Sequence, residues 1–298
     1  SIQYARRSAD KSVLAESFNS QSIIYAYFDQ VELSVAKNYL SLQLATSVND
    51  LPKLANYTRE LGQSQLLISN LVEAEKYFKQ SIEYSKQIFD QRQVALGYSN
   101  LGTVFKERKA YQKAIEFNLK AIDLLEELKD YNGLGDAHNN LGIIYKEQKE
   151  YDLAAQNFNQ ALVFYESTNN RERIAGVYHN VGAVFQQQQK YLIALNYLNR
   201  SIDIRKQFGS KNQIFNTYRI MSDVYNDIGK KELALDYMHK YIHFLDSNVS
   251  LQKSTKIAEL SELYRSEQRE RLIALQADSI ERQRQEKTWT STKLENTM

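Results

Sequence analysis

The sequence repeats itself every 40 residues, and this period constrains the fold more than any other feature. Three segments align in steps of 40 residues: Tyr98–Gly102, His138–Gly142 and Tyr178–Gly182. The small residues Ala114, Ala154 and Ala194 follow the same step. Such a period is typical of stacked-repeat proteins, in which each unit buries its apolar face against its neighbours.

Each unit has the pattern of two helices. In the unit around residue 100, Tyr98, Leu101 and Phe105 are spaced along one helical face. The second half of that unit repeats the spacing with Ile115, Leu119, Ile122 and Leu125. A single proline and ten glycines in 298 residues disfavour a turn-rich β architecture. The sequence therefore predicts an all-α chain of helical hairpins, with Gly and Ala where the paired helices approach closely.

A ladder of residues that can cap helix N-termini indicates where the units begin. Its members are Asp10, Asp50, Asp90, Asp130, Asn170, Ser210 and Ser250. Pro52, the only proline, follows Asp50 by two residues, where it costs no helical hydrogen bond. We predict a solenoid over residues 1–254, with units near 15–54, 55–94, 95–134, 135–174, 175–214 and 215–254. The first unit is degenerate and has serines at its small positions.

The pattern within a unit resembles the tetratricopeptide repeat. The fourth unit carries the family pattern in Leu141, Gly142, Tyr145, Ala154, Phe158 and Ala161. The 40-residue period is similar to that of kinesin light chains, spindle-orientation scaffolds and bacterial peptide-pheromone receptors. The resemblance implies a right-handed superhelical solenoid. In such a solenoid the first helices of the hairpins form a concave groove that holds a peptide or a partner protein.

One asparagine recurs in the first helix of three consecutive units: Asn100, Asn140 and Asn180. Stacked units would align these side chains, and a carboxamide can both donate and accept hydrogen bonds to the backbone of an extended segment. The alternative is that they are solvated residues repeated by duplication. Further candidates for ligand binding in the groove are Asn139, His179, Lys106, Lys146 and Arg219.

Other chemistries lack support in the sequence. The net charge of +2 has no one-signed block, which disfavours a nucleic-acid partner. No apolar run reaches the ~18 residues of a membrane span. His239 and His243 are the only histidine pair with metal-ligand spacing, and two ligands make a poor zinc site. We therefore expect no metal, no cofactor and no active site.

The pattern changes after residue 254. We expect a charged capping or connector helix over 255–287 and a frayed tail over 288–298. The helix could also mediate a homodimer. The chain begins without Met and without a leader, so we expect a soluble, processed or partial chain, either cytoplasmic or the periplasmic part of an anchored sensor. Two functions stay open: the peptide-sensing region of a bacterial signalling protein, or a freestanding scaffold for a multiprotein complex.

Overall fold

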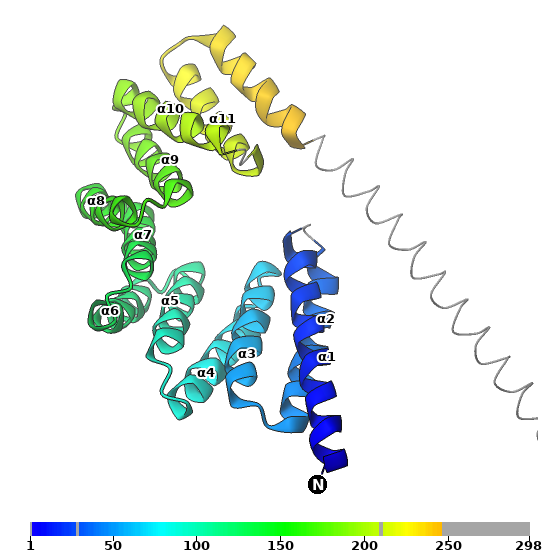
Figure 1. Cartoon of the computed structure of the whole chain (residues 1–298). Coiled ribbons are helices and arrows are strands. Elements are labelled where there is room, and N and C mark those ends of the chain that lie inside the picture. Colours follow the sequence, from blue (N-terminus) through cyan, green and yellow to red (C-terminus); the bar gives the residue numbers. More distant parts are fainter. Residues whose placement is uncertain (1, 28–29, 209–210, 246–298) are drawn as a thin grey trace, which may run out of the picture. The chain divides into compact units, whose positions relative to one another are not determined.

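The computed structural model describes residues 2–27, 30–208 and 211–245, and these form an all-α helical-repeat solenoid (Figure 1). The helices are α1 (Ile2–Tyr27), α2 (Val31–Val48), α3 (Leu51–Leu67), α4 (Leu71–Gln87), α5 (Gln91–Glu107), α6 (Tyr111–Glu127), α7 (Tyr131–Glu147), α8 (Tyr151–Ser167), α9 (Arg171–Gln187), α10 (Tyr191–Gln207) and α11 (Lys211–Asp227). A further helix occupies residues 231–245. Within the described ranges no strand is present, and no helix has both the length and the apolar character needed to cross a membrane.

The predicted cap residues begin four of the first helices. The carboxylates or carboxamide of Asp50, Asp90, Asp130 and Asn170 accept backbone hydrogen bonds from Lys53, Gln93, Gly133 and Arg173 at 3.0–3.3 Å. Asp10 was wrongly expected to cap, because it lies inside α1, which starts at Ile2. Capping residue types also occur within helices, and only the backbone path distinguishes the two cases. Ser210 and Ser250 lie outside the described residues.

The helices from α3 to α10 are each 17 residues long and are joined by three-residue links. In each link one residue adopts a left-handed backbone conformation, as at Phe89 (φ 57°) and Lys129 (φ 52°). The next amide bonds back to the end of the preceding helix, as from Asp90 N to Ser85 O at 2.9 Å. Each of these links thus reverses the chain in the same way.

The repeated small residues lie where the two helices of a hairpin meet. A Cβ atom at Gly142 in α7 would lie 2.6 Å from the ring of Phe158 in α8, so bulk there would separate the helices. Ser222 replaces the glycine in the last hairpin, and its Oγ donates to the Ala234 carbonyl at 2.8 Å. The expected close approach is therefore present in the hairpins.

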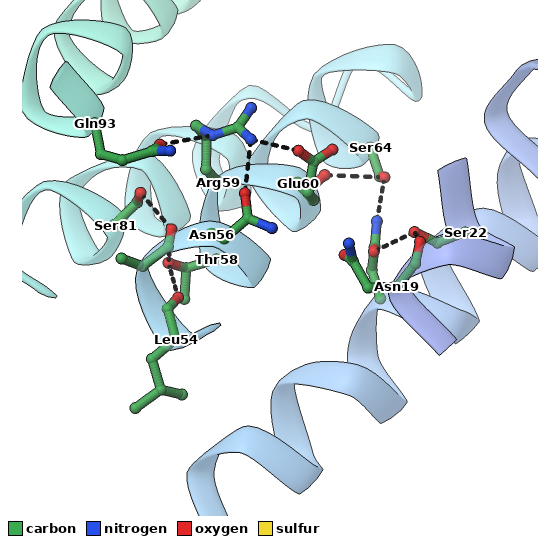
Figure 2. Close-up of polar contacts among 12 residues, drawn as sticks. Asn19, Ser22, Leu54, Asn56, Thr58, Arg59, Glu60, Ser64, Ser81 and Gln93 are labelled. Atoms are coloured by element: carbon green, nitrogen blue, oxygen red, sulfur yellow. Dashed lines mark hydrogen bonds and ion pairs between the residues drawn. The ribbon is translucent and has the colours of Figure 1, made fainter. Parts of the chain in front are cut away.

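The first hairpin buries several polar side chains beside its apolar ones (Figure 2). Ser22 Oγ donates to Asn38 Oδ1 at 2.5 Å, and Asn38 Nδ2 donates to Ser64 Oγ at 2.9 Å. Ser34 and Ser41 are buried beside them. Ser22, Ser34 and Ser41 are the degenerate small positions of the sequence, and hydrogen bonding lets them be buried.

Hairpins stack on one another through apolar side chains of the second helix of one and the first helix of the next. Leu125 of α6 and Leu134 of α7 are buried in one such cluster, together with Leu141 and Ile144. First helices of successive hairpins also touch each other directly, as α5 does α7 and α7 does α9. We call the surface along α3, α5, α7, α9 and α11 the first-helix face.

The hairpins begin at 51, 91, 131 and 171, four residues before the expected unit bounds at 55, 95, 135 and 175. A periodic sequence can be divided at any point, and only the helix ends mark the structural unit. Residues 1–242 form one compact unit. The helix expected over 255–287, the tail over 288–298 and any dimer contact through them lie outside the described residues.

Candidate functional site

All eight predicted ligand-binding residues lie on first helices. Lys106 and Asn100 are on α5, Asn139, Asn140 and Lys146 on α7, His179 and Asn180 on α9, and Arg219 on α11. The side chains of Asn100, Asn140 and Asn180, which we call the asparagine row, are half-buried. Because α5 touches α7 and α7 touches α9, the three asparagines follow one another along the first-helix face.

Asn139 and Asn180 are joined across two hairpins. Asn180 Nδ2 donates to Asn139 Oδ1 at 3.0 Å, and both residues line a cavity of about 360 Å³. The rest of its lining is Tyr165, Glu172, Arg173, Gly176 and Val177. A Cβ atom built on Gly176 would contact nothing within 4 Å, so the cavity is open there. This cavity is mainly polar and is large enough for side chains of an extended segment.

The wall of this cavity is fixed by a buried tyrosine. Tyr165 from α8 donates its hydroxyl hydrogen to Asp136 Oδ1 at 2.5 Å, and Arg173 Nη1 lies 2.9 Å from the same carboxylate. Burial, followed by the charge of Asp136, raises the pKa of Tyr165, so the phenol keeps its proton at physiological pH. No sequence pattern marks this contact, because 29 residues separate the two partners.

A smaller cavity of about 40 Å³ lies beside Asn140. It is lined by Thr103 and Lys106 of α5, Asn118 of α6, and Asn140, Ile143 and Ile144 of α7. Lys106 Nζ lies 2.6 Å from Glu107 Oε1 and 4.0 Å from Glu147 Oε1. The lysine charge therefore already faces carboxylates. Two of the predicted site residues share this cavity with Asn118, a buried asparagine that no sequence motif marks.

His179 is held by a chain of hydrogen bonds from later helices. Its Nδ1 lies 3.0 Å from Thr217 Oγ1, which also accepts from Arg205 Nη1 at 2.8 Å. Since the guanidinium can only donate, the Thr217 hydroxyl hydrogen is available to Nδ1.

The same surroundings keep His179 neutral. Burial, and then the positive charges of Arg205, Lys146 and Arg219, lower the pKa of His179 to about 3. Burial also lowers the pKa of Lys146, and the nearby Glu147 charge opposes that effect. Three predicted residues, His179, Lys146 and Arg219, are thus close enough to influence one another. Thr217 and Arg205 were missed, since no motif marks them.

The first helices on either side of the asparagine row, α3 and α11, have residues other than asparagine at the equivalent position. At the equivalent position of α3, Glu60 Oε1 lies 2.5 Å from Arg59 Nη2, and Arg59 also donates to Asn56 and Gln93 at 2.8 and 3.1 Å (Figure 2). At the other end, Ile220 is buried. Among α3, α5, α7, α9 and α11, this position therefore holds a carboxamide only in α5, α7 and α9.

Two further clefts lie where a second helix meets the next first helix. One, of about 450 Å³, is lined by Tyr178 and Arg200, and the other, of about 530 Å³, by Tyr98 and Lys120 at positions 80 residues earlier. In the hairpin between them, Phe164 stacks on Tyr131 and His138 with ring centroids 6.2 and 5.7 Å apart. None of the row asparagines lines either cleft, so the clefts are separate from the row.

His239 and His243 are the histidine pair of the sequence with metal-ligand spacing. No cluster of three or more histidine or acidic residues in the described part of the chain could hold a metal ion. His239 and His243 lie in the helix over 231–245 and belong to no such cluster among these residues.

Comparison with protein families identifies the repeat. The sequence profile described as tetratricopeptide repeat matches residues 93–167 and 173–242, from α5 to the helix that starts at 231. The chain belongs to the tetratricopeptide repeat family. No curated protein matches the sequence of this tetratricopeptide repeat chain.

Solved structures share the fold of this tetratricopeptide repeat chain. The apo form of RapI has a TM-score of 0.63 at 19% identity, covering 80% of this chain and 85% of its own. BtubC (BKLC) from P. vanneervenii has a TM-score of 0.58 at 18% identity, covering 74% and 90%. A Rap protein complexed with competence and sporulation factor has a TM-score of 0.60 at 11% identity, covering 78% and 75%. At these identities the similarity shows the fold alone.

Proposed function

We propose that this chain is a non-enzymatic module that binds an extended peptide or protein segment on the first-helix face, between α5 and α9. The observation that carries the proposal is the row of Asn100, Asn140 and Asn180. Asn100 and Asn140 make no side-chain hydrogen bond within the described residues, so their carboxamides are available to a ligand.

Carboxamides suit an extended segment because they pair with backbone N–H and C=O groups whatever the ligand sequence. The row supplies general affinity for backbone. Selectivity would come from the neighbouring side chains: the cavity shared by Asn139 and Asn180, the neutral His179, and the cations Lys106, Lys146 and Arg219. Since the charges on this face are mixed, the ligand need not be strongly charged.

Within this function, we propose that the chain is the sensing region of a bacterial signalling protein. The support is indirect: a Rap protein of similar fold is complexed with competence and sporulation factor. The alternative is a scaffold that assembles a complex. A sensor should change its oligomeric state or its hydrogen-exchange protection when a peptide binds, whereas a scaffold should bind without such a change.

The test is to select binders of the unmodified chain from a displayed library of random octapeptides. The affinity of the selected peptides is then measured for the unmodified chain and for the triple variant Asn100→Ala, Asn140→Ala, Asn180→Ala. We expect the unmodified chain to select binders and the triple variant to lose about ten-fold or more in affinity, while its unfolding midpoint changes little. The matched control replaces three exposed amides on the second helices α4, α8 and α10, namely Gln80, Asn159 and Asn199, with alanine. If no peptide is selected, or if both triple variants bind equally well, the proposal is wrong.

A further inference from the structure

One buried position differs between hairpins in a way that packing does not explain. The position opposite the small residue of the first helix holds Phe78, Phe158 or Leu198 in three hairpins, all fully buried. Asn38 and Asn118 occupy the same position in the first and third hairpins, and they are buried too. A polar group in such a place needs hydrogen-bond partners.

Asn38 has partners for both ends of its carboxamide, and Asn118 does not. Ser22 donates to the Asn38 carbonyl, and Ser64 accepts from its amide. The residues at the matching positions around Asn118 are Gly102 and Ile144, which have no polar side chain. Asn118 Nδ2 donates to the Ala114 carbonyl at 2.8 Å, whereas its Oδ1 has no hydrogen-bond partner among the described residues.

Asn118 lines the small cavity beside Asn140. That cavity of about 40 Å³ is lined by this buried asparagine, by Asn140 of the row, by Lys106 and by Thr103. The remaining walls are Ile143 and Ile144. A cavity needs at least roughly 10–15 Å³ to hold one water molecule, so this one exceeds that minimum and has room for a small group only.

The polar groups that line the cavity restrict which ligand group can bind there. Asn118 Oδ1 needs a donor, so a carboxylate would set its own lone pairs against that oxygen. The Lys106 charge is already paired with Glu107, so the cavity does not require an anionic ligand. The same charge would repel a cationic ligand. A neutral group with both donors and an acceptor meets all of these conditions. A primary carboxamide is such a group, and it is small.

We propose that this cavity is a subsite that receives the carboxamide of one asparagine or glutamine side chain of the bound peptide. The inference rests on the proposed function, because Asn140 of the asparagine row lines the subsite. In the complex, the ligand amide N–H donates to Asn118 Oδ1, and the ligand carbonyl accepts from Lys106 or Asn140.

The first experiment repeats the octapeptide selection with Asn118→Leu. Leucine fits opposite a glycine at this position, as Leu198 does opposite Gly182. We expect the unmodified chain to select peptides with Asn or Gln at one fixed position, and Asn118→Leu to lose that preference and about ten-fold or more in affinity for them. Phe158→Leu, at the same position of the next hairpin, is the matched control and should keep both.

The outcomes separate the two proposals. If peptides are selected but share no Asn or Gln position, or if Asn118→Leu binds them as the unmodified chain does, the subsite is overturned while the peptide function stands. If no peptide is selected, the proposed function fails. The subsite is then tested separately by whether it binds acetamide. In a ¹⁵N NMR titration, acetamide should shift the Asn118 and Asn140 side-chain signals, while acetate should not. Equal shifts at Asn140 in Asn118→Leu, or none in the unmodified chain, would overturn it.

Discussion

At the scale of single residues, the stability of this chain depends on whether buried polar atoms have partners. Asn38 and Asn118 share a position and a degree of burial, and they differ in their hydrogen bonds. Leaving a buried acceptor unpaired costs about 1–3 kcal/mol. Asn118 should therefore lower the stability of its hairpin, whereas Asn38 should not.

Asn118→Leu should raise the free energy of unfolding by about 1–3 kcal/mol, since it removes an unpaired acceptor and adds apolar contact. Urea denaturation followed by circular dichroism measures the change. Asn38→Leu is the control and should be destabilising, because it removes the hydrogen bonds that Asn38 makes with Ser22 and Ser64. Similar shifts of the two variants in the same direction would contradict this explanation.

His179 makes stability depend on pH. Its pKa is about 3 in the folded chain and ~6.5 in the unfolded chain, so the unfolded state takes up a proton first as the pH falls. Stability is therefore lost as the pH decreases from ~6.5 towards ~3. Between about pH 7.5 and about pH 5, the loss from this group should be up to about 2 kcal/mol. In His179→Gln, the loss of unfolding free energy between these two pH values should be smaller by that amount, as measured by urea denaturation. An equal loss in the variant and the unmodified chain would show that His179 is not the source of the pH dependence.

At the scale of the element, a side-chain cap marks the start of α3, α5, α7 and α9, and a left-handed residue lies in each link between helices from α2 to α10. Asp90 is bonded at the start of α5, whereas Glu150 at the start of α8 makes no such side-chain bond. The preceding links place residues such as Phe89 and Lys129 at positive φ, a conformation that costs roughly 1–2 kcal/mol for residues other than glycine. The caps stabilise the fold and the links oppose it.

Asp90→Ala should lower the free energy of unfolding by about 1 kcal/mol, because the Gln93 amide loses its acceptor. Thermal or urea denaturation measures the effect. Glu150→Ala should change the midpoint much less, since that side chain caps nothing. If both variants lose the same amount, the cap is not the source of the stability.

Phe89→Gly should stabilise the chain by about 1 kcal/mol, because glycine removes the cost of the left-handed backbone. The Phe89 side chain is 86% exposed, so little packing is lost, while glycine tolerates the φ of 57°. Phe89→Ala tests the reason, because alanine removes the ring but keeps the unfavourable backbone. A melting temperature that rises as much in Phe89→Ala as in Phe89→Gly would assign the gain to the exposed ring instead.

At the scale of the whole solenoid, each hairpin is stabilised by itself and by its neighbours. The hairpin of α1 and α2 joins α3 through buried serines and asparagine as well as through a small apolar cluster that includes Ala45 and Leu54, whereas the central hairpins join through leucine, isoleucine and phenylalanine. Polar pairs add less net free energy than apolar burial of similar area. Local opening should therefore begin at the N-terminal hairpin.

Hydrogen exchange followed by mass spectrometry tests this order. We expect the amides of α2 to exchange faster than those of α5 to α8, although the helix lengths are similar. Ser22→Ala together with Asn38→Leu and Ser64→Ala would replace the polar contacts by apolar ones and should narrow the difference. Uniform exchange along the solenoid would show that its hairpins open together.

The sequence alone determined the all-α class, the 40-residue hairpin and the helix starts at Asp50, Asp90, Asp130 and Asn170. These follow from local rules, since capping and helical spacing involve residues within one or two turns. It also placed the asparagine row on first helices, while ligand binding by that row stays a prediction.

Only the tertiary structure decided which residues surround that row. The hydrogen bonds that hold His179 come from α10 and α11, and the cavity beside Asn140 draws its lining from α5, α6 and α7. Whether Asn118 is paired depends on Gly102 and Ile144, which come from the helices on either side of it in the chain. Such contacts arise from the packing and stacking of hairpins. Local spacing in the sequence does not predict them, because the helices that make them are far apart in the chain.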